Sequence, residues 1–400
     1  MSNSTEIMSN SHSELSLSKT LLFAITGGIA VGNLYWAQPL LVNISETLNT
    51  SITLVGGLIT ATQLGYAFGI LLIVPLGDTL NRKRLIPSVM LCSAIALLLC
   101  ATATNFITLT LSLCCLGLTT ISGQLITPLA SEMAKPEQRG KIVGIIVSGM
   151  LTGILLSRSI SGFIADVFGW RAIYFIASLL MLVLSVVIFR SIPQEAKRGN
   201  LSYPRLLRSV LSTVTKYKTA QVTLLLGATS FFVFSALWTG ITFLLSVQPY
   251  SYSLSQIGMV GLVGLAGALV ARKAGVLHDK GHSYPGLIIG LLLALLALVL
   301  CLFFSSSIAV LLLGILIFDI GIQMLNVLNQ TRLLTIDPEA RNRLNTAFVC
   351  CNFIGGALGS ALAGALWERL GWNALILTCT AVILMAISIT VRNQKHLINQ

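Results

Sequence analysis

Long runs of apolar residues, separated by short polar segments, make up most of the chain. A run of about 18 or more apolar residues is long enough to cross the hydrocarbon core of a bilayer as a helix. The pattern therefore predicts an all-α membrane protein with twelve spanning helices. They are expected at residues 20–44, 53–77, 85–103, 106–130, 142–165, 171–190, 219–247, 255–276, 284–304, 308–330, 343–366 and 372–391.

The composition agrees with this pattern. The chain is 55% hydrophobic and only 10% charged, whereas a soluble domain carries about 25% charged residues. A net charge of +12 would otherwise suggest a nucleic-acid partner. The cations, however, lie in short loops between apolar runs, where they act as a topology signal, and they are not interleaved with aromatic residues. We therefore expect a lipid bilayer as partner, and no nucleic acid.

The positions of the cations predict which loops face the cytoplasm. If the N-terminus is cytoplasmic and every span crosses, all but three of the 25 Lys and Arg residues fall in cytoplasmic segments. Arg171 and Arg369 fall in external loops, and Arg158 lies inside a span. This bias follows the positive-inside rule, supports the number of spans and predicts that both termini are cytoplasmic.

The longest polar segment separates the sixth and seventh spans and carries seven of the cations. It would suit a lipid-headgroup or partner site, but we favour a solvated linker between two halves. The predicted organisation is a cytoplasmic tail (1–19), a six-helix bundle (20–190), a basic cytoplasmic linker (191–218), a second six-helix bundle (219–391) and a cytoplasmic tail (392–400).

An internal repeat relates the two predicted bundles. Three landmarks recur at a nearly constant offset of roughly 200 residues, and chance matches at one offset are improbable. Two such halves in parallel orientation place a binding site near the membrane midplane between them. The landmarks are Asp78 and Asp279; PEQR at 136–139 and PEAR at 338–341; and Gly162-x3-Asp166-x2-Gly169-Trp170 and Gly364-x3-Glu368-x2-Gly371-Trp372.

These features resemble the major facilitator superfamily. The resemblance covers the whole chain and rests on the 6+6 arrangement, the loop motif at 74–84, its echo at 275–281 and Gly169-Trp170-Arg171 at the sixth span. The loop motif departs from the family pattern at Val74, Thr79 and Asn81. Within the superfamily, Gln38-Pro39-Leu40 and the segment 75–78 resemble bacterial proton-antiport exporters of drugs and sugars.

Asp319 is the first candidate for function, because ionisable groups inside a membrane are costly and therefore informative. It lies about eleven residues into its predicted helix, near the midplane, and Gln323, Asn326 and Gln330 share its helical face. Such a polar stripe requires a water-filled cavity. Burial disfavours the ionised carboxylate and a nearby cation favours it, so an alternating environment suits a proton carrier. The predicted role is binding of a proton or of a cationic substrate; a permanently paired structural acid is the alternative.

Arg158 is the second ionisable group within a span. It stays charged and so requires an acid, carbonyl groups or an anionic substrate as partner. Asp319 and Asp166 are the two candidate acids, and substrate or proton-coupling work and a structural pair are equally compatible with the sequence.

Other polar and aromatic residues in the predicted spans are candidates for lining the same cavity. Their aromatic members would either stack on an amphipathic ligand or anchor the helices at the interface. The candidates are Asn33, Tyr35, Trp36, Gln38, Gln63, Tyr66, Gln124, Phe234 and Trp238.

The resemblance also implies a cytoplasmic gate between the halves. In the family, the second helix meets the eleventh and the eighth meets the fifth, so Asp78 and Asp279 are expected to latch the N-terminal ends of the opposite helices. The retained basic residues of the motif are gate candidates too, whereas Arg82 is interpreted as a topology signal only. The gate candidates are Asp78, Lys83, Arg84, Arg139, Asp279, Lys280 and Arg341.

Several other classes of function are not supported by the sequence. The four histidines lie in loops or tails, and the eight cysteines lie in apolar runs without a CxxC pair or a nearby histidine, so neither a metal site nor disulfides are expected. No phosphate-binding glycine motif opens a helix in a polar segment, and no catalytic cluster lies within the spans. We therefore expect neither an enzyme nor direct ATP drive.

The resulting expectation is a monomeric secondary transporter of a bacterial inner membrane, without a cofactor and driven by the proton gradient. It would export a small molecule such as a drug or sugar in exchange for protons, by rocking of the two bundles. The alternative is a proton symporter or facilitator that imports a sugar or an organic acid.

Overall fold

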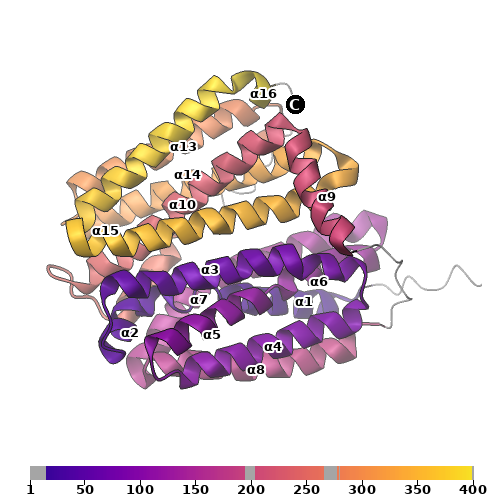
Figure 1. Cartoon of the computed structure of the whole chain (residues 1–400), viewed down its shortest axis with the longest axis horizontal. Helices are drawn as coiled ribbons and strands as arrows, with labels where there is room; N and C mark the ends of the chain where they lie inside the picture. Colours follow the sequence, from indigo (N-terminus) through magenta and orange to yellow (C-terminus); the bar gives the residue numbers. More distant parts are fainter. Residues whose placement is uncertain (1–14, 194–202, 265–276, 279, 399–400) are drawn as a thin grey trace, which may run out of the picture.

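The computed structural model describes residues 15–193, 203–264, 277–278 and 280–398, and the side chains of these residues except those of 338 and 398. Within these ranges every regular element is helical. Figure 1 shows two helical bundles side by side, one formed by the N-terminal half (indigo to magenta) and one by the C-terminal half (red through orange to yellow). The described helices thus agree with two halves built from consecutive parts of the chain.

The N-terminal half contains six spans, two of which are interrupted. The first consists of α1, a short 3-10 turn and α2, and the fourth of α5 and α6. The elements are α1 (Leu17–Gly32), η1 (Gln38–Leu40), α2 (Leu41–Thr47), α3 (Ile52–Leu72), η2 (Val74–Asp78), α4 (Arg82–Thr102), α5 (Phe106–Thr119), α6 (Ser122–Met133), η3 (Pro136–Gln138), α7 (Arg139–Phe168) and α8 (Trp170–Ser191).

The C-terminal half repeats this plan. In α15 two spans are merged at Gly371, whose φ of 73° is not helical and matches the φ of 80° at Gly169 in the first half. The elements are α9 (Tyr203–Lys216), which precedes the bundle, α10 (Lys218–Ser246), α11 (Leu254–Val260), η4 (Gly261–Gly264), α13 (Ser283–Phe303), α14 (Ile308–Thr335), η5 (Pro338–Ala340), α15 (Arg341–Arg392) and α16 (Gln394–Ile398).

Nine described helices are long and apolar enough to cross a membrane, and one of them is the double span α15. The shorter apolar segments Leu17–Gly32 and Leu254–Gly264 supply the first and eighth spans. The twelve-span fold predicted from hydropathy is therefore confirmed. The end of the eighth predicted span, 265–276, lies outside the described residues, as does Asp279.

The two interrupted spans of the first half face each other at their breaks. Pro39 has no N–H to continue the helix, and the chain between Gly32 and η1 is irregular. Irregular backbone at membrane depth is tolerated where protein buries it or where it lines a water-filled cavity. Here Thr120, between α5 and α6, donates its hydroxyl to Ala30 O at 2.9 Å and accepts the Asn33 amide at 3.1 Å. Hydropathy predicted two unbroken helices, 20–44 and 106–130, because it does not register such local pairing.

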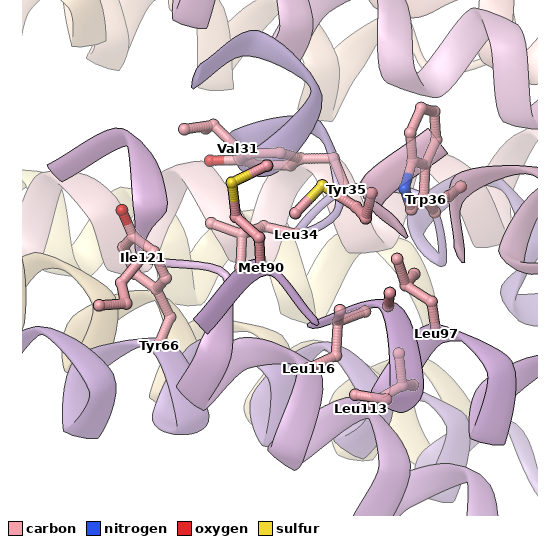
Figure 2. Packing of buried hydrophobic residues seen from close by; sticks show 14 of the residues in the cluster. Val31, Leu34, Tyr35, Trp36, Tyr66, Met90, Leu97, Leu113, Leu116 and Ile121 are labelled. Atoms are coloured by element: carbon pink, nitrogen blue, oxygen red, sulfur yellow. The ribbon is translucent and has the colours of Figure 1, made fainter. Parts of the chain in front are cut away.

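Buried side chains around these breaks form the core of the first half. In Figure 2, Leu34 from the irregular segment lies beside Met90 of α4, and Tyr35 and Trp36 lie above Leu97 of α4 and Leu116 of α5. Trp36 donates its indole N–H to Asn33 Oδ1 at 2.8 Å. Trp36 therefore belongs to the packed core. This differs from both roles that the sequence left open for the aromatic candidates, stacking on a ligand and anchoring at the interface.

The described part of the linker between the halves, which we expected to be a solvated segment, is helical and largely exposed. It contains the helix α9, which packs against α15, α10 and η2 and lies across one end of both bundles (Figure 1). Tyr203 donates its hydroxyl to Leu72 O of the first half at 2.5 Å. Tyr217 donates to the Asp337 carboxylate of the second half at 2.9 Å, and this hydrogen bond lowers the pKa of Asp337. The described part of the linker is thus docked on both halves.

Two glycines of α7 provide a test of the packing between α1 and α7. A Cβ at position 149 would lie 2.6 Å from Ala24 O, whereas one at position 144 meets nothing within 4 Å. Alanine favours a helix over glycine by about 1 kcal/mol at either site, but overpacking costs about 1–3 kcal/mol. We expect Gly149→Ala to lower the thermal unfolding temperature in detergent and Gly144→Ala to leave it unchanged or raise it. Equal effects of the two changes would contradict the close approach of the helices.

Candidate functional site

A cavity of about 120 Å³ lies between the two halves. The first half supplies Tyr35 from the irregular segment and Arg158 from α7. The second half supplies Phe234 from α10 and Asp319 from α14. The cavity therefore brings together the two ionisable groups that the sequence placed inside the spans.

The guanidinium of Arg158 is held by one hydrogen bond and by aromatic rings. Its side chain is only 3% exposed, and Nε donates to Gln38 Oε1 at 2.6 Å. Its Cζ lies 4.1 Å from the ring centroid of Trp238 and 5.2 Å from that of Tyr35. Nη2 is buried and has no hydrogen-bond partner among the described residues. Arg158 therefore offers a positive donor to the cavity.

The carboxyl group of Asp319 contacts the indole edge of Trp238. The residue is 5% exposed, and the Trp238 indole N–H donates to Oδ1 at 3.3 Å. Trp238 thus stacks on the cation with its face and binds the carboxylate with its edge. Cation and carboxylate, one from each half, are joined through one indole ring.

Neither of the two acids named as candidate partners of Arg158, Asp319 and Asp166, forms a salt bridge with it. Within the described part of the chain, neither carboxylate lies within the 4.0 Å salt-bridge distance of Arg158. Asp166 accepts backbone hydrogen bonds from Leu254 and Ser255 instead, at 3.0 and 2.8 Å. Sequence reasoning missed Gln38 as a partner because its amide lies 120 positions away along the chain.

Most of the polar stripe on α14 faces the cavity. Gln323 and Asn326 line it together with Asp319, and Asn326 lies 3.3 Å from the amide of Asn352 on α15. Gln330 points elsewhere and donates to Asn345 Oδ1 at 2.9 Å. The helical spacing thus placed three of the four stripe residues at the cavity.

Four other candidates are engaged outside the cavity. Asn33 binds Thr120 and Trp36 within the first half. Gln63 donates to Ser235 Oγ of α10 at 2.6 Å and so crosses between the halves. Tyr66 accepts from Gln124 Nε2 at 3.3 Å, and its ring lies 4.4 Å from that of Phe353. These side chains support the walls rather than line the space.

The sequence did not single out several lining residues. Ser230 and Phe231 of α10 line the cavity one turn before Phe234. Gly264, at the end of η4, lines it as well. A Cβ at Gly264 would lie 2.8 Å from Asp319 Oδ2. The helical spacing of 227, 230, 231 and 234 on the face of the already selected Phe234 was the signal available in the sequence.

A family model described as Major Facilitator Superfamily matches residues 23–335. The chain belongs to this superfamily. It is 40% identical over 378 residues to the uncharacterized transporter YgaY of Escherichia coli O157:H7, covering 94% of this chain and 96% of that one. It is 30% identical over 355 residues to the probable transporter SCO4007 of Streptomyces coelicolor, covering 88% and 82%. The resemblance inferred from the loop motif and the 6+6 arrangement is confirmed.

Solved structures agree at the level of the fold. A bacterial homolog of the human lysosomal transporter Spinster, in an inward-facing and occupied conformation, matches with a TM-score of 0.77 at 16% identity, covering 94% of this chain and 96% of that one. The nucleoside transporter NupG matches with a TM-score of 0.72 at 15% identity, covering 94% and 98%. As a member of the major facilitator superfamily, the protein is a multi-pass membrane transporter that works by alternating access of a small molecule to the two faces.

The cations of the gate predicted from the family lie on their own halves. Lys83 lies 5.8 Å from the ring centroid of Phe189 on α8, and Arg84 is exposed. Arg139 donates to Ala134 O at 3.4 Å, and Arg341 to Leu334 O at 3.1 Å. Asp78 and Lys280 are exposed. The latch between halves at this face stays a prediction.

Arg82 is a correction to the topology-only interpretation. It is 2% exposed, donates Nε to Gly77 O at 3.0 Å and forms a 2.8 Å ion pair with Glu132. This ties the loop after α3 to the end of α6. A loop cation and a buried cation look alike in the sequence when the partner lies 50 positions away.

Proposed function

We propose that this transporter exports a small amphipathic molecule in exchange for protons, and that Asp319 carries the coupling proton. The observation that supports this most is the placement of Asp319. It is an almost fully buried carboxyl group in a cavity between the halves. Among the described residues, no cation lies within 4.0 Å of it.

The physical argument for proton binding follows from this setting. An ionised carboxylate without a contacting cation is costly in a closed, largely apolar cavity, so closure favours proton uptake. When the cavity opens to water, hydration of the carboxylate favours proton release. Alternating access would therefore alternate the proton affinity of Asp319, which is the requirement for coupling to a proton gradient.

The same cavity suggests the kind of cargo. Tyr35, Phe231 and Phe234 offer aromatic surface, while Gln323 and Asn326 offer amide groups. One cation and one acid face the space, so a highly charged solute is not favoured. A small molecule with an apolar or aromatic part and a few polar groups fits this lining best.

A second candidate is uptake of a hydrogen-bonding or anionic solute. It is favoured by Arg158 Nη2, which is buried without a partner among the described residues. Solved structures with this fold include a nucleoside transporter and a human organic anion transporter, MFSD10, the latter with a TM-score of 0.71 at 18% identity and coverage of 94% and 100%.

The test measures compound accumulation in cells of a bacterial strain that lacks its main efflux pumps, with and without this protein. A panel of drugs, sugars, nucleosides and organic acids is compared. We expect lower accumulation of at least one amphipathic compound, and loss of the difference when a protonophore collapses the gradient. Raised accumulation of a sugar, nucleoside or acid would replace export by uptake. Lower accumulation that persists with the protonophore would contradict proton coupling.

A further inference from the structure

Two carboxylates at equivalent positions of the internal repeat each bind the opposite half. Asp166, near the end of α7, accepts hydrogen bonds from Leu254 N at 3.0 Å and Ser255 N at 2.8 Å, and also from the Ser255 hydroxyl. Glu368 in α15 accepts a hydrogen bond from Thr53 N at 2.8 Å. The repeat that the sequence shows as Gly-x3-acid is thus a pair of contacts between the halves.

Both carboxylates bind the first turn of a spanning helix. Leu254 and Ser255 open α11, and Thr53 is the second residue of α3. The first N–H groups of a helix have no partner within the helix, and the helix dipole makes this end positive. A carboxylate placed there forms charge-assisted hydrogen bonds. Each contact therefore ties a helix of one half to the start of a helix of the other.

The glycine of each motif allows this approach. Gly162 precedes Asp166 by one helical turn, and a Cβ there would overlap Leu254 O. Gly364 has the same position before Glu368, and its Cβ would lie 2.8 Å from Thr53 O. In each seam the glycine admits the opposite helix and the acid binds its free N–H groups. This accounts for the recurrence of both residues in the two halves.

The two contacts lie at one face of the molecule. Asp166 lies near the end of α7, which begins at Arg139, and Glu368 lies three residues before the break of α15 at Gly371, in the segment that begins at Arg341. The cation distribution predicts that this is the external face. The contacts lie on both seams between the halves, α7 with α11 and α3 with α15. Opening the cavity to this face by rocking the halves requires both contacts to break.

We propose that Asp166 and Glu368 form a paired latch that stabilises the transporter in the state closed at the external face. This inference goes beyond the proposed function. It rests on alternating access and on the contacts between the halves, and it is independent of the substrate, of the direction of transport and of Asp319. The two carboxylates are positioning residues that act on the conformational equilibrium.

The test measures distances across the external face by double electron–electron resonance. Spin labels are attached through p-acetylphenylalanine at Thr104 and Ser306, exposed positions in the α4–α5 and α13–α14 loops. This chemistry leaves the eight native cysteines in place. We expect Asp166→Asn or Glu368→Gln to raise the ratio of open to closed protein about threefold each, and the double variant to raise it about tenfold.

Two controls separate the latch from general effects. Glu46→Gln removes a negative charge from an exposed site near the same face, at the end of α2, and should leave the distances unchanged.

Leu254→Ala and Leu254→Pro both remove the leucine side chain, but only proline removes the N–H that Asp166 binds. At the first position of a helix proline is otherwise tolerated. We expect a larger open population with proline than with alanine.

The proposal would be overturned by a single variant, Asp166→Asn or Glu368→Gln, whose distance distribution matches the wild type. It would also be overturned if Glu46→Gln shifts the distribution as far. Because the single variants keep one seam intact, they remain informative even where the double variant does not fold. Failure of the latch would leave the accumulation results for the proposed function unaffected.

Discussion

Asp319→Asn should abolish transport driven by the proton gradient while the protein remains folded. Asparagine has nearly the same shape, and its carbonyl oxygen still accepts the Trp238 N–H that lies 3.3 Å from Oδ1. It cannot bind or release a proton. We expect gradient-driven transport to fall below about a tenth of the wild-type rate, because the only proposed site of proton exchange is lost.

The measurement compares two modes of transport in proteoliposomes that contain a compound found in the accumulation assay. Net transport driven by a pH gradient should be lost, while exchange of labelled for unlabelled compound should continue, because exchange requires no net proton movement. Glu46→Gln, an acid-to-amide change outside the cavity, serves as the control and should retain both modes. Gradient-driven transport by Asp319→Asn at the wild-type rate would remove Asp319 from the coupling mechanism.

The spans were predictable because a membrane helix must be long and apolar, and local sequence reports both properties. The break after Gly32 was not predicted, although Pro39 marks it. The hydrogen bonds that stabilise it join Ala30 and Asn33 to Thr120, which is distant in the sequence. The same holds for α9, whose docking depends on Tyr203 and Tyr217 meeting backbone and carboxylate groups of two different halves.

The candidate site was predictable in its charges but not in its contacts. Asp319 and Arg158 could be identified from the sequence because placing an ionisable side chain inside a membrane span costs free energy and is therefore usually tied to function. Their connection through Trp238 depends on three helices, α7, α10 and α14, and no spacing along the chain reports it. The repeated acids Asp166 and Glu368 were visible in the sequence as a pattern. Their partners, the first N–H groups of α11 and α3, became visible only in the structure.

Arg158→Lys should lower the transport rate about tenfold or more, although the positive charge is kept. The guanidinium is planar, which lets it lie 4.1 Å from the Trp238 ring centroid while Nε donates to Gln38 Oε1. An ammonium group cannot satisfy both contacts in the same geometry and would leave either the ring or the amide. Trp238 also binds Asp319, so a shift of the Trp238 ring would change the surroundings of the Asp319 carboxyl group.

A second arginine in the chain provides a matched control. Arg171 stacks on Trp170 with a Cζ-to-centroid distance of 4.2 Å and donates to Ala103 O at 2.9 Å, and it is not among the residues that line the cavity. Arg171→Lys disturbs the same kind of contact and should leave the initial transport rate within about twofold of the wild type. A comparable loss in both variants would indicate that stacked arginines serve stability in general. Loss confined to Arg158→Lys would assign to the Arg158–Trp238–Asp319 connection a role in transport, because Arg171, which is half-buried, makes a similar ring contact away from the cavity.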